Sequence, residues 1–176
     1  MKFTRLVTVD DADVLLDVVR LNREFLAPWE PSRREEYFTL DRQRAVIRTA
    51  LEAWERGANL PCVILGDSGQ VVGKVSLNGI VRGAFQSCSV SYWVSRVENG
   101  HGLATAAVRE IVDVAFGELG LHRVQAETLL HNVKSQRVLE RNDFVRFATA
   151  PAYLKIAGRW QDHAIYQKLA PTTLGA

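Results

Sequence analysis

The sequence is poor in cysteine and has no long apolar run. Its two cysteines in 176 residues, Cys62 and Cys88, lack the spacing of a metal site or of a Cys-x-x-Cys redox pair. Both stand in apolar, strand-like stretches, so we expect reduced thiols in the core and no bound metal. No apolar stretch approaches the ~20 residues of a membrane-spanning helix, and the first residues carry no signal-peptide pattern. These absences predict a cytoplasmic protein that does not use a membrane.

The chain also lacks a large excess of charge of either sign. Its formal net charge of +2 at pH 7 is too small for the basic face that nucleic-acid binding requires, so we expect no direct contact with nucleic acid. Hydrophobic residues make up 47% and charged residues 24%, as in globular proteins. A length of 176 residues suits one domain, residues 1–176, with one core. A monomer and a homodimer both stay open.

The pattern of apolar residues predicts a mixed α/β fold. Thr8 and Asp11 have the spacing of a helix-capping box, and two helices are expected between residues 11 and 57. The predicted element order is βααβββαβαββ, with strands over residues 2–9, 60–66, 71–79, 86–94, 121–128, 144–149 and 160–169, and with later helices over 102–119 and 133–141. The strand–helix–strand unit of residues 86–128 makes its two strands parallel. We expect a ligand crevice there, where the strand order changes.

A glycine-containing loop opens the predicted helix at residue 102. Glycines at a helix start leave backbone amides uncovered, and with the helix dipole they make an anion site that suits a pyrophosphate. One alternative is a turn without a ligand. Another is a dinucleotide-binding fingerprint formed by Gly100, Gly102 and Thr105, with Glu127 as the ribose-binding acid. The antiparallel strands expected before the loop disfavour this second alternative.

Two motifs resemble those of GNAT-superfamily N-acetyltransferases. Residues 102–107 resemble the acetyl-CoA pyrophosphate loop Q/R-x-x-G-x-G/A, with Asn99 in the place of the usual Gln or Arg and Ala106 where many relatives have Glu. Residues 132–144 resemble the next motif, N-x-x-S-x-R-x-L-E-x-x-G-F, with Asp143 in the place of the usual Gly.

The resemblance is most specific to the ribosomal-protein-alanine N-acetyltransferases, the RimJ/RimL group, and within it to the RimJ type. Its segments are residues 22–31, 81–85, 131–135 and 158–163, which together span most of the chain. The resemblance implies a single-domain GNAT fold that holds acetyl-CoA between two splayed parallel strands. It also implies direct acetyl transfer to the α-amine of a protein N-terminus, for example that of a ribosomal protein.

The same resemblance implies roles for particular residues. Ser135 would donate the proton that the departing thiolate takes up, and Asn132 would hold the pantetheine or an ordered water. The tyrosine that many GNAT enzymes place near the thiolate corresponds to Leu139 here. Main-chain groups of one strand and of the loop would bind the cosubstrate: Tyr92, Trp93 and Val94 for the pantetheine, and Asn99, Gly100, His101, Gly102, Leu103, Ala104 and Thr105 for the pyrophosphate.

The acceptor side is less well defined by the sequence. By resemblance, Trp29, Glu24, Glu30 and Arg82 would line the acceptor groove, and the acidic side chains would attract a basic N-terminal segment. A buried anchoring role for Trp29 and a solvated surface for the acidic residues stay open. The general base is also open, with Glu24, Glu30 and Glu127 as candidates.

Two other functions compete with N-terminal acetylation. The same fold also serves enzymes that acetylate a small amine such as an antibiotic or a polyamine, because fold does not fix substrate. A CoA-binding module without catalysis is the third possibility. The presence of both Asn132 and Ser135 argues against that third possibility.

Overall fold

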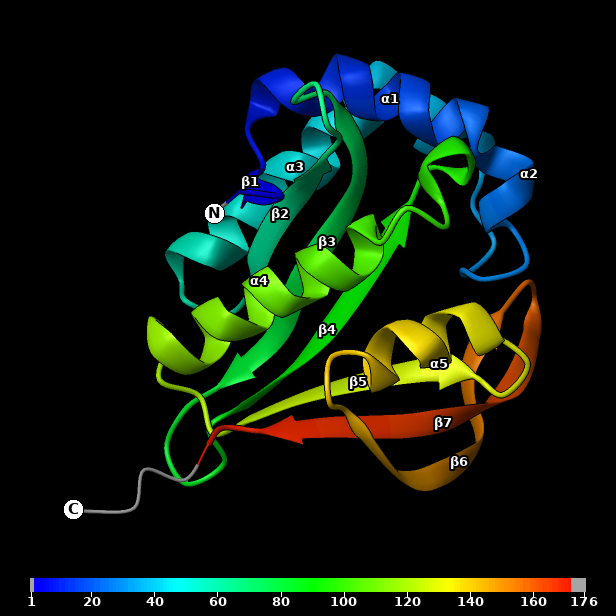
Figure 1. Cartoon of the computed structure of the whole chain (residues 1–176). Coiled ribbons are helices and arrows are strands. Elements are labelled where there is room, and N and C mark those ends of the chain that lie inside the picture. Colours follow the sequence, from blue (N-terminus) through cyan, green and yellow to red (C-terminus); the bar gives the residue numbers. More distant parts are fainter. Residues whose placement is uncertain (1, 172–176) are drawn as a thin grey trace.

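The fold is built on one seven-stranded sheet, seen in a computed structural model that describes residues 2–171 (Figure 1). The strand order is β1-β2-β3-β4-β5-β7-β6. The strands are β1 (Thr4–Leu6), β2 (Leu60–Leu65), β3 (Val71–Val81), β4 (Ser87–Val94), β5 (Arg123–Leu129), β6 (Val145–Ile156) and β7 (Arg159–Leu169). The helices are α1 (Ala12–Leu21), α2 (Arg23–Leu26), α3 (Leu40–Glu55), α4 (Leu103–Gly117) and α5 (Val133–Glu140), with short 3₁₀ turns η1 (Val9–Asp11), η2 (Glu35–Phe38) and η3 (Arg96–Glu98).

The sheet is mixed, as the sequence predicts. Strands β4 and β5 pair in parallel, while the other neighbouring strands pair antiparallel. Helix α4 makes the crossover between β4 and β5, which confirms the strand–helix–strand unit.

Helices cover both faces of the sheet, so there is a hydrophobic cluster on each face. Successive side chains of β2 point alternately into one cluster and the other. The side chains of Cys62 and Ile64 pack in the cluster that contains α4, whereas Val63 packs with α1 and α3 in a second cluster. The two faces are therefore called the α4 face and the α3 face. Cys62 and Cys88 are buried free thiols, and burial raises the pKa of each to about 12. Both therefore stay protonated at neutral pH, as expected of core thiols.

Three elements differ from their predicted bounds. Strand β1 is shorter, because the chain turns into η1 right after it. The four-residue helix α2 adds an element to the predicted order. Strand β6 extends beyond residue 149 although Pro151 interrupts the pattern, because β6 is an edge strand and an edge tolerates a proline. Its pairing with β7 shifts register between Ala150 and Leu154, where Ala152 adopts a left-handed φ of 46°.

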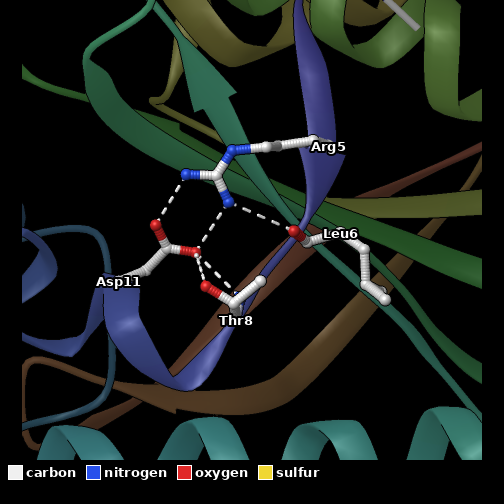
Figure 2. Close-up of polar contacts among 4 residues, drawn as sticks. All are labelled: Arg5, Leu6, Thr8 and Asp11. Carbon is white, nitrogen blue, oxygen red and sulfur yellow. Dashed lines mark hydrogen bonds and ion pairs between the residues drawn. The ribbon is translucent and has the colours of Figure 1, made fainter.

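The corner between β1 and η1 is held by a buried carboxylate (Figure 2). The Arg5 guanidinium donates to both oxygens of Asp11 at 2.6 and 2.8 Å, and the Thr8 amide donates to Asp11 at 2.8 Å in the predicted capping box. Burial by itself would raise the pKa of Asp11. The hydrogen bonds from Arg5 and Thr8 outweigh that effect and hold this pKa below its ordinary value.

Two kinds of feature are absent from the described part of the chain. No helix within residues 2–171 is both long and apolar enough to cross a membrane. Over the same residues, no three His, Cys, Asp or Glu side chains gather closely enough to hold a metal ion.

Candidate active site

Strands β4 and β5 separate after a short parallel stretch. They pair only from Ser87 with Arg123 to Ser89 with Gln125, and then diverge toward their carboxyl ends (Figure 1). Residues 90–94 of β4 remain paired with β3 on the other edge. Within the described residues, the edge of β4 that faces the divergence has no strand partner there. Backbone groups on that edge are not used in a strand pair, although the Val94 carbonyl accepts from the Asn99 side chain.

A cavity of about 400 Å³ lies between the end of β4 and helix α5, and we call it the α4/α5 cavity. It is lined from α2 and its following loop, β4, α4 and α5. The predicted cosubstrate residues among its lining are Tyr92, Trp93, Val94, Asn99, Ala104 and Asn132. Trp29 and His131 close one side, with their ring centroids 5.6 Å apart.

The loop before α4 has the geometry of an anion site. Gly100 and Gly102 have left-handed φ angles of 93° and 83°, and Gly102 is the N-cap of α4. No atom lies within 4 Å of where a Cβ would stand on either glycine, so the backbone is open to a close ligand. The first turn of α4 contains no acidic residue that would repel an anion. These features fit a pyrophosphate.

The neighbouring residues hold the loop in place. Asn99 donates its side-chain amide to the carbonyls of Val94 and Ser95, which fastens the loop to the end of β4. The Leu103 side chain is buried in the core, and the Thr105 carbonyl accepts from Asn142 at 3.2 Å. His101 is exposed and does not line the α4/α5 cavity.

A second cavity, of about 490 Å³, lies on the α3 face, and we call it the sheet-face groove. Its floor contains two cross-strand pairs from β3 and β4, Lys74 with Trp93 and Ser76 with Ser91, and Asn78 farther along β3. The loop after α2 forms one side with Trp29 and Glu30. The backbone amide of Ala157, at the β6–β7 turn, donates to the Glu30 carbonyl at 3.1 Å. This contact joins the loop to the β6–β7 hairpin beside the groove.

The two cavities meet at one group of side chains. The residues that line both are Leu26, Trp29, Tyr92, Trp93, Asn132 and Ser135. At this junction the Tyr92 hydroxyl reaches across from β4 to α5, 2.9 Å from the Ser135 Oγ and 3.1 Å from the Ser135 carbonyl. The predicted proton donor therefore stands where the two cavities join.

Two contacts fix Ser135. The Asn132 side chain caps α5 and accepts the Ser135 amide at 3.2 Å. Burial raises the pKa of Tyr92, which keeps its phenol protonated and able to donate a hydrogen bond. The sequence assigned only the main chain of Tyr92 to function, whereas the structure adds its hydroxyl. Strand alternation turns Tyr92 toward α4, but no pattern in the sequence shows that Ser135 lies opposite.

The groove also contains one carboxylate from β5. Glu127 accepts a hydrogen bond from the Ser89 hydroxyl at 3.0 Å. Burial raises the pKa of Glu127, although the Ser89 hydrogen bond and nearby His163 oppose that rise. The His163 Nδ1 lies 2.9 Å from the Gln161 carbonyl, and His163 lines the same groove.

Of the three candidate bases, Glu127 and Glu30 line the groove and Glu24 is exposed outside it.

The predicted acceptor residues do not all reach the groove. Trp29 lines both cavities and is 38% exposed, so it is a wall rather than a buried anchor. Glu30 lines the groove beside Arg33, at 3.5 Å. Arg82 lies elsewhere: it follows β3 at the closed end of the β4–β5 pair, and its guanidinium donates to the Leu119 carbonyl after α4. The β3–β4 turn faces away from the open end, which is why the structure does not bring Arg82 to the site.

Comparison with known proteins identifies the family. The family model described as Acetyltransferase (GNAT) domain matches residues 3–145, most of the chain. The chain belongs to the GNAT acetyltransferase family. This GNAT protein is 35% identical over 170 residues to the probable N-acetyltransferase YjcK of Bacillus subtilis, covering 96% of this chain and 94% of YjcK.

Two further relatives carry more specific names. The chain is 30% identical over 168 residues to the ribosomal protein uS5-alanine N-acetyltransferase of Escherichia coli, covering 95% of this GNAT chain and 87% of that protein. The solved structure of Mycobacterium smegmatis RimJ in complex with CoA-disulfide superposes with a TM-score of 0.92 at 27% identity, covering 98% of this chain and 84% of RimJ. The fold and family predicted from the motifs are thereby confirmed.

Proposed function

We propose that this GNAT protein transfers the acetyl group of acetyl-CoA to the α-amine of a protein N-terminus, with ribosomal proteins in the cytoplasm as the class of substrate. The observation that carries the proposal is the junction of two cavities at Ser135, one beside the glycine loop and one on the opposite face of the sheet. The name of the Escherichia coli relative supports the acceptor class.

The cosubstrate would bind with its pyrophosphate on the amides that start α4 and its pantetheine along residues 92–94. Its thioester would then lie at the junction. The acceptor amine, entering from the sheet-face groove, attacks the thioester carbonyl directly. As the carbon–sulfur bond breaks, the Ser135 hydroxyl donates its hydrogen to the thiolate and regains one from water. Tyr92 and Asn132 hold Ser135 in place for this step.

We propose Glu127 as the group that takes up the proton of the amine. It lines the groove, and its raised pKa brings it closer to the pH at which a base is most effective. Burial raises the pKa of Glu30 in the same groove as well. Arg33 stands beside Glu30, however, and stabilises its charged form, which makes Glu30 the weaker candidate.

An α-amine is also the acceptor that needs the least help. With a pKa near ~7.8, about a tenth of an α-amine is neutral at pH 7, whereas a lysine amine near ~10.4 is neutral in well under ~0.1% of molecules. A modest base such as Glu127 therefore suffices for an N-terminus.

A turnover assay tests the proposed function. Release of the CoA thiol is measured with peptides that begin with Ala or Ser, with the same peptides blocked at the N-terminus but containing an internal Lys, and with polyamines and aminoglycosides. Unblocked peptides should give the highest kcat/KM, and mass spectrometry should place the acetyl group on the α-amine. If a polyamine or an aminoglycoside exceeds every peptide, the small-amine function replaces the one proposed.

A further inference from the structure

The polar floor of the sheet-face groove contains one charged side chain, Lys74. Lys74 stands on β3 opposite Trp93 of β4, and Trp93 lines both cavities. On the neighbouring strand Lys74 faces Val63, which belongs to the core. Burial lowers the pKa of the Lys74 ammonium, and nearby Arg33 lowers it further while Glu30 opposes them. A half-buried cation in this setting is costly unless an anion compensates it.

The other charged groups along the groove already have partners. Arg33 lies over the Tyr37 ring, 4.5 Å from its centroid, and contacts Glu30. Glu127 accepts from Ser89. For Lys74, by contrast, the structure of residues 2–171 shows no hydrogen bond and no ion pair within 4.0 Å. Its ammonium is available to a molecule bound in the groove.

We infer that Lys74 binds a carboxylate of the acceptor, next to the amine that is acetylated. Neighbouring strands lie about 4.8 Å apart, so Lys74 stands one strand away from the Trp93 junction where the amine must react. That spacing suits either the side-chain carboxylate of a second-position Asp or Glu, or the α-carboxylate of a very short acceptor. This inference rests on the N-terminal acetylation proposed above and specifies which N-termini are preferred.

The inference reverses the charge preference that the sequence indicates. The acidic residues expected to attract basic acceptors are not free in the groove: Glu24 lies outside it, Glu35 is exposed and pairs with Arg23, and Glu30 stands beside Arg33. Lys74 feels the charge of Glu30 but, among the described residues, has no direct hydrogen bond or ion pair with it or with any other group.

Matched peptides test the subsite. The kcat/KM is measured for Ala-Asp, Ala-Asn and Ala-Lys peptides of one length with amidated ends, and for Ala-Ala with a free or an amidated carboxyl end. In the wild type the Ala-Asp peptide should exceed the Ala-Asn peptide by about tenfold, the effect of one charge-assisted hydrogen bond. A comparison of Ala-Ala with a free carboxyl end and Ala-Ala with an amidated one shows whether an α-carboxylate binds at the same site.

Two substitutions assign any preference to Lys74. Lys74→Met, which keeps the length and removes the charge, should reduce the Asp/Asn ratio to near one, and Lys74→Glu should favour the Ala-Lys peptide. Lys155→Met, on the exposed edge strand β6, should keep the wild-type ratio.

The possible outcomes distinguish a failure of the Lys74 subsite from a failure of the proposed function. Equal rates with the Ala-Asp and Ala-Asn peptides and with both forms of Ala-Ala, or a preference that survives in Lys74→Met, would overturn the Lys74 subsite and leave the proposed function standing. Acetylation of polyamines but of no peptide would overturn both.

Discussion

At the scale of single residues, the contact between Tyr92 and Ser135 is the least expected feature of the site. Many relatives place a tyrosine on the helix at the position of Leu139, and here that position is a buried leucine. The phenol comes instead from β4, 43 residues before Ser135 in the chain. When the phenol donates to the Ser135 Oγ, the serine hydrogen is left to point at the thiolate. In the proposed mechanism Tyr92 is therefore a positioning residue for Ser135.

Removal of the Tyr92 hydroxyl should slow chemistry without weakening cosubstrate binding. We expect Tyr92→Phe to lower kcat about tenfold and Ser135→Ala to lower it about 100-fold, each with a nearly unchanged KM for acetyl-CoA. The double variant should be no slower than Ser135→Ala, because the two groups act as a unit. Tyr166→Phe, which removes a hydroxyl 3.5 Å from Gln136, is the matched control. Additive losses would show that Tyr92 acts independently of Ser135.

Asp143 has a backbone conformation that residues other than glycine rarely adopt. It follows α5 with a left-handed φ of 61°, and the Phe144 amide donates to the Leu139 carbonyl, as in a helix end that usually takes glycine. The related motif has Gly at this position.

We expect Asp143→Gly to be more stable than Asp143→Ala by about 1 kcal/mol, since only glycine adopts this conformation without strain. Both variants lose the 3.4 Å contact with Lys168, so their difference isolates the backbone. In thermal unfolding this difference corresponds to a Tm gap of about 2–4 °C. Equal midpoints would mean that the left-handed conformation carries no cost here.

At the scale of elements, the start of α4 is where we propose that the cosubstrate pyrophosphate binds. A side chain on Gly102 would introduce backbone strain and also occupy space that a pyrophosphate needs. Gly120, beyond the other end of the same helix, has a similar left-handed φ of 61° and no atom within 4 Å of where its Cβ would stand. Substitutions at the two glycines therefore distinguish the effect of backbone strain from the effect of a side chain in the space of the pyrophosphate.

Gly102→Ala and Gly120→Ala should cost similar stability, about 1 kcal/mol each. Only Gly102→Ala should weaken acetyl-CoA binding, by at least about tenfold in Kd, when binding is measured by calorimetry. Similar affinities for acetyl-CoA in both variants would place the pyrophosphate elsewhere.

The β1–η1 corner makes stability depend on pH through Asp11. Its pKa is lower in the folded protein than in the unfolded chain, so its contribution is present above about pH 4 and is lost as the pH falls through the folded pKa. We expect Asp11→Asn to lower the free energy of unfolding by about 1–3 kcal/mol at pH 7, because it leaves Arg5 without its partner.

Urea unfolding of the wild type and the variant from pH 7 to pH 3.5 measures this effect, and the gap between them should narrow at the acid end. Asp13→Asn removes a mostly exposed carboxylate 3.7 Å from Arg44 and should change stability little. A gap that stays constant with pH would exclude the Asp11 charge as its cause.

What could not be predicted from the sequence is also clearest at the scale of helices and strands. The glycine loop and the parallel strand–helix–strand unit are local patterns, so both were predictable from residues near in sequence. The acceptor side is assembled from β3, β5, β7 and the loop after α2, and Lys74 joins Trp93 there through strand pairing alone. Lys74, Ser76 and Asn78 alternate with Val75 and Leu77 along β3, and this pattern alone does not show what their face of the strand meets. Arg82 was assigned from a motif whose place in the fold lies at the other end of the sheet.

At the scale of the whole molecule, the sheet separates two cavities. It is continuous where β4 pairs with β5 and open beyond Ser89, so the only passage that the described residues show between the faces is the junction at Ser135. The α4/α5 cavity and the sheet-face groove therefore need not compete for space.

This partition has a kinetic consequence. If the two substrates bind as proposed, either should enter while the other is bound, and the acetyl group should move only when both are present. Double-reciprocal plots at several fixed acceptor concentrations should accordingly intersect rather than run parallel. Labelled CoA should not exchange into acetyl-CoA in the absence of acceptor, because no acetylated form of the protein stores the group between two half-reactions.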